Sequence, residues 1–262
     1  MKLDSIAQYN QLRWEELARA DVLYSRPWED LDPASARARL DPQGVLGTVE
    51  GKQVLCLANG GGQQSAAFAL MGAQVTVVDF AATQLERDQE TAAFYGVSIQ
   101  CYQEDMRDLS FLAGQSFDVV WQAYSINYVP DIKPVIAEVS RVLKPGGFYR
   151  LDFANPYVMG MDERSYDGNG YPLRLPYIDG AEIQFDHPKW ELWDEKGARK
   201  LMSGPRQYRH TLSKVTNMVI GYGFNILRLW EDIHAPDQTP GTWDHFTYIA
   251  PPIITFWMQN SF

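Results

Sequence analysis

The chain has 262 residues, of which 45% are hydrophobic and 21% charged, as expected for a globular protein of one large α/β domain or two small ones. The formal net charge of −10, without a run of lysine or arginine, disfavours a nucleic acid partner. We expect a cytoplasmic protein without a membrane partner, because no apolar stretch approaches the about 20 residues of a membrane span and the first residues lack a signal peptide's apolar core.

The first 50 residues predict an N-terminal cap rather than part of a core sheet. Tyr9, Leu12, Leu17 and Ala20 mark the apolar face of a helix. The stretch 25–42 that follows contains three prolines, which favours an irregular lid.

Apolar runs alternate with helical patterns over residues 51–155. Strands are expected over 52–58, 73–79, 97–105, 116–125 and 148–156, and helices over 63–72, 81–95 and 132–147. Almost continuously apolar strands that alternate with helices predict a parallel sheet with helices on both faces.

The alternation breaks in residues 156–208, which are rich in glycine, proline and aromatic residues. This composition predicts an insertion with two or more antiparallel strands and a turn at DGNG, residues 167–170. Residues 209–262 then predict a helix over 210–224, strands over 225–232 and near 245–250, and an apolar tail that completes the core or a dimer interface. The expected organisation is one domain, as a monomer or homodimer.

A glycine loop, Gly60–Gly62, follows the first expected strand and precedes a helix. Such a loop offers backbone N–H groups to a ligand, and glycine permits a close approach. Asp79 ends the second expected strand, where its carboxylate can accept both hydroxyls of a ribose. Asp105 and Met106 end the third and can flank an adenine. NAD stays possible here, although GxGxxG is absent, whereas the lack of GK[ST] excludes a P-loop.

Four segments in sequence resemble the motifs of class I S-adenosylmethionine-dependent methyltransferases. The first motif of that family is similar to VLCLANGGG, the second to VTVVDF, the third to QEDMRDLSF and the fourth to SFDVVWQAYSINYVPD. The segment before the family's fifth strand resembles EVSRVLKPGGFYRLDF. The resemblance implies a doubly wound, Rossmann-like α/β sheet of seven strands, mostly parallel with an antiparallel last strand. It also implies S-adenosylmethionine as cofactor and S-adenosylhomocysteine as product.

The resemblance implies a set of cofactor-binding residues in the core, residues 51–155. They are Ala58, Asn59, Gly60, Gly62, Gln64, Asp79, Phe80, Asp105, Met106, Gln122, Ala123 and Tyr128. Cys56 departs from the family because an acid is usual there, and Ala58 departs because a glycine is usual. The cofactor's ammonium then needs another partner, for which backbone carbonyls of the loop, Asn59 and Gln122 remain alternatives.

Methyl transfer from a sulfonium is an in-line displacement, so the protein's main task is to align the reactants and exclude water. A base is needed only if the acceptor arrives protonated, and no catalytic residue can be read from the fold. His210 is the one candidate, since the resemblance places it near the cleft, while His187 and His245 are expected to be structural. The expected substrate residues are Tyr24, Trp28, Tyr124 and His210.

The leading hypothesis is a methyltransferase for a small-molecule acceptor, because the cap and the insertion predict a closed pocket. The alternative is a catalytically inactive nucleotide-binding, sensor or scaffold protein of the same fold, which the altered loop favours. The absence of GxGxxG disfavours an NAD-dependent oxidoreductase, and the acidic charge disfavours an RNA methyltransferase. No metal site is expected, because Cys56 and Cys101 belong to or adjoin buried strands without metal-ligand spacing.

Overall fold

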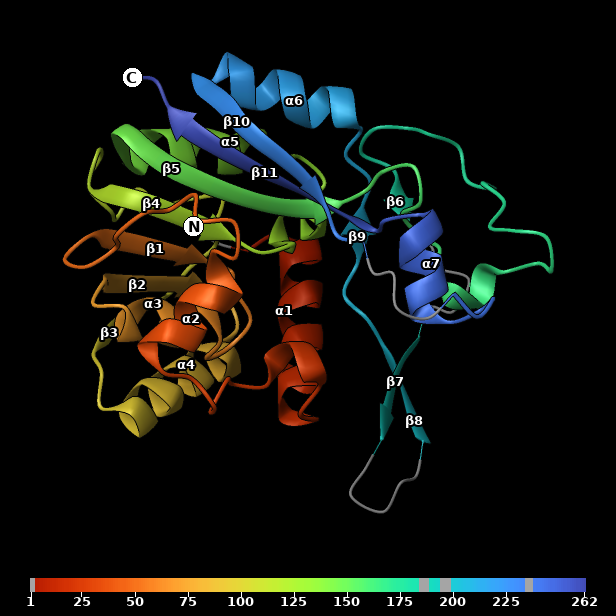
Figure 1. Cartoon of the computed structure of the whole chain (residues 1–262), viewed down its shortest axis with the longest axis horizontal. Coiled ribbons are helices and arrows are strands. Elements are labelled where there is room, and N and C mark those ends of the chain that lie inside the picture. The colour runs from red at the N-terminus through yellow and green to blue at the C-terminus, as the bar shows by residue number, and fades with distance from the viewer. Residues whose placement is uncertain (1–2, 184–188, 194–198, 234–237) are drawn as a thin grey trace.

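The computed structural model describes residues 3–183, 189–193, 199–233 and 238–262, with only the backbone of 189–193 and 199–200. Figure 1 shows a twisted sheet with helices on both faces and a smaller part beyond one end of the strands. The helices are α1 (Ser5–Arg19), α2 (Pro33–Leu40), α3 (Gln64–Leu70), α4 (Ala82–Tyr95), α5 (Lys133–Val142), α6 (Leu212–Gly221) and α7 (Trp243–Ile249), with 3-10 turns η1 (Leu23–Ser25), η2 (Ser125–Tyr128) and η3 (Glu163–Ser165). In the described ranges, none of the helices is both long and apolar enough to cross a lipid bilayer.

The main sheet has seven strands in the order β10-β11-β5-β4-β1-β2-β3. Only β11 runs antiparallel to its neighbours, β10 and β5. The strands are β1 (Gln53–Leu57), β2 (Gln74–Asp79), β3 (Ile99–Gln103), β4 (Phe117–Gln122), β5 (Leu143–Ala154), β10 (Phe224–Glu231) and β11 (Ile253–Asn260). The predicted seven-stranded, mostly parallel fold is confirmed.

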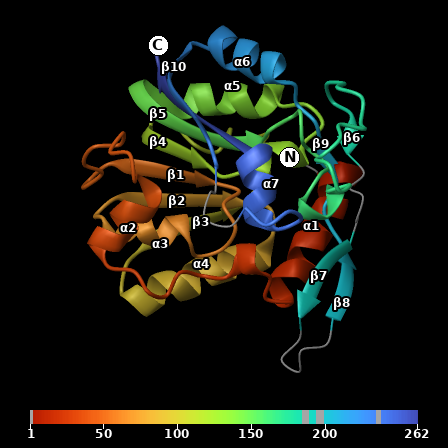
Figure 2. The same ribbon diagram turned by 45° about the vertical axis from the view of Figure 1, so that its right-hand side comes forward.

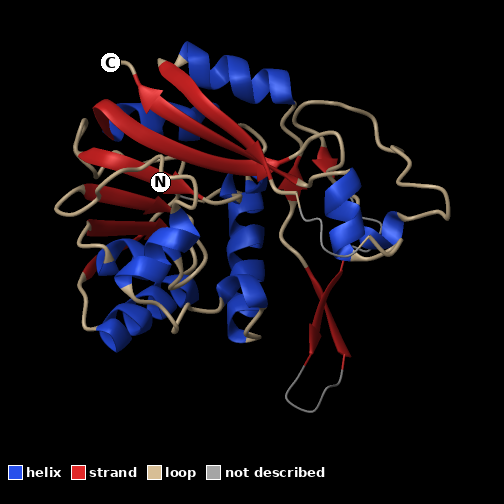
Figure 3. Cartoon of the chain, in the orientation of Figure 1, coloured by secondary structure: helices blue, strands red, loops and turns tan. Residues whose placement is uncertain are grey.

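Two apolar layers, one on each face of the sheet, hold the fold together. Val54 and Cys56 of β1 face the layer of α2, α3 and α4, where Phe68 packs. Leu55 and Leu57 face the layer of α5 and α6. Figure 3 shows these helices on the two faces. A central parallel strand covered on both faces is apolar wherever it is buried, which is why β1 is apolar from Val54 to Leu57.

The last strand lies later in the chain than expected. The strand expected near 245–250 is wrong, because this segment belongs to helix α7. The Thr242 hydroxyl accepts a hydrogen bond from the His245 N–H at 3.2 Å and so caps the start of the helix. The apolar tail instead forms β11, with Trp257 only 1% exposed, and therefore completes the core of this chain.

The helix expected over 132–147 ends earlier, at Val142. The KPGG segment belongs to β5, whose first residue, Leu143, pairs with Phe117 of β4. The register with β4 then shifts between Phe117 and Val119. Glycine at 146, with a φ of 75°, allows this irregular start of the strand.

The insertion contains the antiparallel strands that its composition predicts. They are β6 (Glu182–Ile183) with β9 (Gln207–Tyr208), and β7 (Lys189–Trp193) with β8 (Arg199–Ser203). Figure 2 shows β7 and β8 projecting past α1. The DGNG segment does form a turn, in which the Asp167 N–H donates to the Gly170 carbonyl at 3.1 Å, but the turn does not join two of the described strands.

Candidate functional site

The glycine loop runs close against α4. Gly60, Gly61 and Gly62 have φ values of 85°, 84° and 79°, which only glycine adopts without strain. A Cβ on Gly61 would lie 2.5 Å from Gln84 Oε1, and one on Gly62 would lie 2.2 Å from Thr91 Oγ1. The loop therefore needs glycine both for its backbone conformation and for its distance from α4.

A buried carboxylate that sequence reasoning missed, Asp88 of α4, holds this loop. Its Oδ1 accepts hydrogen bonds from the Gly62 N–H, at 2.7 Å, and from the Ser65 hydroxyl. Its side chain is 1% exposed, and burial raises the pKa of Asp88 to about 6. A signal was present in the sequence, because Gln84, Asp88 and Thr91 repeat at the spacing of one helix face, and all three are buried.

Asp79 lies at the end of β2, as predicted. Its side chain is 6% exposed, and its Oδ1 accepts the Ala81 N–H at 2.8 Å. Burial, with smaller effects of the Asp88 and Glu15 carboxylates, raises the pKa of Asp79 to about 7. The Phe80 N–H also favours the charged form of this carboxyl and partly opposes the rise of its pKa, and ribose binding by Asp79 stays a prediction.

Helix α1 stands across the carboxyl ends of the parallel strands, as Figures 1 and 2 both show. Gln11 of α1 donates to the Phe80 carbonyl after β2 at 2.5 Å. Glu15 accepts the Ala82 N–H, at the start of α4, at 2.8 Å. The helix therefore lies directly over the segment that includes Asp79 and Phe80.

The same helix also joins the end of β4 to the insertion. The Asn10 amide donates to the carbonyls of Tyr128 and Arg206, at 3.0 and 3.1 Å, and accepts the Arg206 N–H at 2.7 Å. The ring of Trp14 meets that of Tyr128 edge to face, with centroids 5.3 Å apart. The predicted cap thus covers the ends of the strands on both sides of the glycine loop.

Asp105 and Met106 follow β3 and are both buried. Both oxygens of Asp105 are bonded to Arg107, with Nε to Oδ1 at 3.0 Å and Nη2 to Oδ2 at 2.6 Å. Arg107 also pairs with Asp4, the N-cap residue of α1, at 2.6 Å. The Met106 sulfur accepts from the Gln122 amide at 3.3 Å. An ion-pair chain therefore connects the end of β3 to the cap.

The proteins that the chain resembles are methyltransferases. The family model described as a methyltransferase domain matches residues 55–151. An uncharacterized methyltransferase of Bacillus subtilis, YbaJ, is 31% identical over 195 residues, which cover 73% of this chain and 72% of the relative. The chain belongs to the class I S-adenosylmethionine-dependent methyltransferases. The predicted family, enzyme class and cofactor are confirmed.

Two further matches agree with this family. A ubiquinone biosynthesis O-methyltransferase of Pseudomonas syringae is 33% identical over 148 residues, or 54% of this chain and 64% of that enzyme. A putative S-adenosylmethionine-dependent methyltransferase from Listeria monocytogenes has the same fold, with a TM-score of 0.62 and 18% identity over 87% of this chain and 99% of that one. The chain therefore spans a little under two thirds of the Pseudomonas enzyme.

The methyltransferase's own residues fit the methionine end of its cofactor. Asn59 is 3% exposed, and both polar atoms of its side chain lack a partner among the described residues. Gln122, the other side chain considered for the ammonium, is already engaged, because Oε1 accepts from the Tyr149 hydroxyl at 2.5 Å and Nε2 donates to Ser125 Oγ at 3.0 Å. A buried polar group without a partner is costly, so the geometry favours Asn59 for the ammonium.

The other predicted cofactor residues surround the same edge of the sheet. Ala58 follows β1 with a φ of 48°, a left-handed conformation that suits the glycine usual in the family. Gln64 begins α3, and its buried Oε1 has no partner in the described part of the chain. Ala123 lies between β4 and η2. The binding roles of these residues remain predictions.

The four predicted substrate residues separate into two groups. Tyr124 lies close to the predicted cofactor residue Tyr128, with ring centroids 6.1 Å apart, and its hydroxyl donates to Gln207 Oε1 at 3.2 Å. His210 is 2% exposed, its Nε2 lies 2.9 Å from the Val129 carbonyl, and burial lowers its pKa. His210 therefore holds the segment after β4 in place, and a role in catalysis stays a prediction.

Trp28 lies on the other side of the glycine loop. The Trp28 N–H donates to the Gly62 carbonyl at 3.2 Å, and its ring packs in the layer of α2 and α3 under the Arg39 guanidinium. Tyr24, which is 61% exposed, lies instead near Tyr124 and Tyr128, because it adds to the effect of burial that raises the pKa of both hydroxyls. The structure therefore does not bring Trp28 together with Tyr124 and His210.

Of the remaining histidines, His187 and His245 are predicted to be packing or surface residues. His245 lies in α7 rather than at the start of a strand, and its Nδ1 lies 2.8 Å from the Tyr171 hydroxyl. His187 and His234 lie outside the described residues.

Gly62→Ala is expected to lower the free energy of unfolding by about 1–3 kcal/mol more than Gly168→Ala, because its new methyl group would meet the Thr91 hydroxyl. Gly168 is the matched control, since its φ is also positive, at 99°, and no atom of the described residues lies within 4 Å of its Cβ position. Chemical denaturation measures the difference. Equal losses in the two variants would show that only backbone strain matters at Gly62.

Proposed function

We propose that this methyltransferase acts on a small-molecule acceptor. The observation that carries the proposal is the position of α1, which bonds to the ends of β2 and β4, to the start of α4 and to the insertion. A site that its own chain covers in this way favours an acceptor small enough to be enclosed. The net charge of −10 also disfavours a nucleic acid.

The reaction assigns a task to each part of the site. S-adenosylmethionine, when bound, supplies a methyl group already activated by the positive sulfonium. In our proposal Asp79 accepts the ribose hydroxyls, Asn59 accepts from the ammonium, and the glycine loop sets the position of both. Helix α1 excludes water from the strand ends, which protects an in-line transfer.

The name of one relative supports this acceptor class. The Pseudomonas protein is named a ubiquinone biosynthesis O-methyltransferase, and we propose that this chain likewise methylates a small organic molecule. We further propose that the chain functions as one domain, with a cap at 1–50, a cofactor core at 51–155, an insertion at 156–208 and a closing segment at 209–262.

The test is to follow tritium from labelled S-adenosylmethionine into a cell extract separated by dialysis into small metabolites and retained macromolecules. We expect labelled compounds other than S-adenosylmethionine in the dialysable fraction, separated from the donor by chromatography, and none above background when Asp79→Ala replaces the wild type. Label that enters only protein or RNA would contradict a small-molecule acceptor.

The affinity for S-adenosylmethionine should rise about tenfold between pH 6 and pH 8 and then level off. The pKa of Asp79 is raised to about 7 by burial, and hydroxyl donors favour its charged form, so binding below pH 7 must release a proton. Calorimetry in two buffers of different ionisation enthalpy measures this release. Asp79→Asn should remove it, while Asp88→Asn controls for the Asp88 carboxylate, whose pKa is about 6.

The raised pKa of Asp79 also makes the folding stability of the cofactor-free protein depend on pH. Because the folded pKa of Asp79 lies above the unfolded value, the stability that protonation of this group contributes is lost as the pH rises through about 7. Bound cofactor should reduce that loss. A cofactor affinity that stays flat from pH 6 to pH 8 would argue against ribose binding by Asp79.

A further inference from the structure

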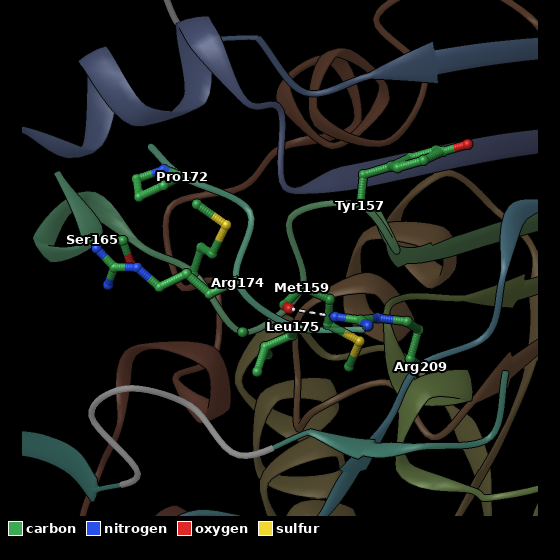
Figure 4. Close-up of a pocket in the computed structure, with 9 residues that line it drawn as sticks. Tyr157, Met159, Ser165, Pro172, Arg174, Leu175 and Arg209 are labelled. Carbon is green, nitrogen blue, oxygen red and sulfur yellow. Dashed lines mark hydrogen bonds between the residues drawn. The ribbon is translucent and has the colours of Figure 1, made fainter. Parts of the chain in front are cut away.

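A buried arginine directly after the insertion has no carboxylate partner in the described part of the chain. Arg209 follows β9 and is 1% exposed. Its two Nη atoms donate to the backbone carbonyls of Pro176 and Met159, the latter at 3.1 Å, whereas Nε has no hydrogen-bond partner among the described residues. Figure 4 shows the guanidinium directed at the Met159 carbonyl beside a pocket.

Other arginines of the chain, unlike Arg209, pair with a carboxylate. Arg206, three residues earlier, pairs with Glu182, and Arg107 pairs with Asp105. The chain has 33 acidic and only 23 basic residues, so carboxylates are abundant. A buried charge without a counter-ion costs several kcal/mol, and burial accordingly lowers the pKa of Arg209. Two carbonyl dipoles compensate this cost only in part.

The pocket beside Arg209 lies beyond the end of β5. Its walls include Tyr157, Met159, Ser165 and Leu175, and Arg174 lies at its exposed rim. Figure 4 shows the Arg174 and Arg209 guanidinium groups on different sides of this pocket. The pocket thus combines apolar walls with two cations.

The pocket adjoins the side of the fold where the acceptor is expected. Met159 packs with Ala154, the last residue of β5, and with the ring of Tyr124 after β4. The carboxyl ends of the strands are where an open α/β sheet binds its ligands. An acceptor group held in this pocket would therefore lie next to the strand ends that we assign to the methyl donor.

We infer that the acceptor carries an oxyanion, a carboxylate or a phosphate, which Arg209 binds in this pocket. The inference rests on the proposed function. The planar guanidinium is suited to an oxyanion, since its N–H groups form a fixed fork, and Nε is the donor still free. A purely structural role as a clamp between Met159 and Pro176 explains the Nη contacts but leaves the buried Nε–H unexplained.

The first test titrates the wild-type protein, loaded with S-adenosylmethionine, with anions at constant ionic strength in sodium chloride. The readout is the ¹⁵N–¹H resonance of Arg209 Nε, assigned by its loss in Arg209→Lys. Acetate and benzoate represent carboxylates, inorganic phosphate and phenyl phosphate represent phosphates, and benzamide is the neutral control. We expect one anion class to move the resonance in a saturable manner and benzamide not to move it. An unmoved resonance, or an equal effect of benzamide, overturns the inference.

The second test measures anion affinity by calorimetry in variants. Arg209→Gln should weaken binding at least about tenfold, as the loss of a charged hydrogen-bond donor predicts, and Arg209→Lys should restore part of it. Arg206→Gln is the matched control, because its guanidinium pairs with Glu182 at the surface, and should bind as the wild type does. Equal losses in Arg209→Gln and Arg206→Gln overturn the inference. If Arg209→Gln does not fold, the wild-type titration still decides.

The two proposals fail in different ways. If tritium enters neutral small molecules and anions leave the Arg209 resonance unmoved, the small-molecule function stands and the anion site does not. If tritium enters only protein or RNA while anions still bind at Arg209, the anion site stands but the proposed acceptor class fails, and with it the link between them.

Discussion

Asp79→Ala is expected to weaken S-adenosylmethionine binding by at least about 100-fold. The ribose presents two hydroxyl donors, and each hydrogen bond to a carboxylate is worth about 1.5–3 kcal/mol. The site is buried, with Asp79 only 6% exposed, so water replaces these bonds poorly. Calorimetric titration with S-adenosylmethionine and S-adenosylhomocysteine measures the loss for both ligands.

The matched control for Asp79 is Glu90→Ala, which removes an exposed carboxylate from α4 and should leave the affinity within about twofold, as surface substitutions usually do. The stability of Asp79→Ala at pH 8 should change little, because relief of the buried charge offsets the lost bond to the Ala81 N–H. An Asp79→Ala variant that binds both ligands as tightly as the wild type would sink the ribose assignment.

Asp88→Ala is expected to lower the free energy of unfolding by about 2–4 kcal/mol, because it leaves the buried N–H of Gly62 and hydroxyl of Ser65 without their acceptor. It should also weaken cofactor binding at least about tenfold, since the loop loses the contact that holds its conformation. Denaturation at pH 7.5 and calorimetry measure the two effects.

Asp88→Asn separates the hydrogen bonds from the charge. The amide oxygen can still accept from Gly62 and Ser65, so this variant should lose less than half of what Asp88→Ala loses. Glu90→Ala, two residues further along the same helix and exposed, should lose nothing measurable. If Asp88→Ala is as stable as Glu90→Ala, the contact to the glycine loop does not hold the loop in place.

The glycine loop shows that a sequence motif alone does not reveal which distant side chains support it. The sequence has Cys56 where the family usually has a carboxylate, and the structure buries this thiol within β1. Asp88 approaches the same loop from α4, 26 residues after Gly62. A helix residue reaches a distant loop only through packing of the two elements, so no local pattern reveals the pair.

The prediction near the end of the chain failed for a similar reason. HFTYIA has the aromatic and β-branched residues of a strand, but Thr242 caps a short helix there, and α7 packs its Phe246 against Val158 and Ala250. The tail IITFWMQN instead forms β11, which lies between β5 and β10 and pairs with both. Pairing partners in a sheet override local propensity.

The sequence by itself determined the fold class, the succession of the central strands and helices along the chain, and the location of the glycine loop and Asp79, and the family resemblance indicated the cofactor. These features depend on short-range patterns: apolar runs, helical periodicity, and glycine or acid at strand ends. Only the tertiary structure decided that α1 covers the strand ends and that Asp88 supports the loop. It also decided that, among the described residues, the Asn59 side chain has no partner whereas Gln122 has, and that no carboxylate pairs with the buried Arg209. Each of these features depends on contacts between residues far apart in the chain. Such contacts contribute energy only once packing has removed water and brought the groups within contact distance.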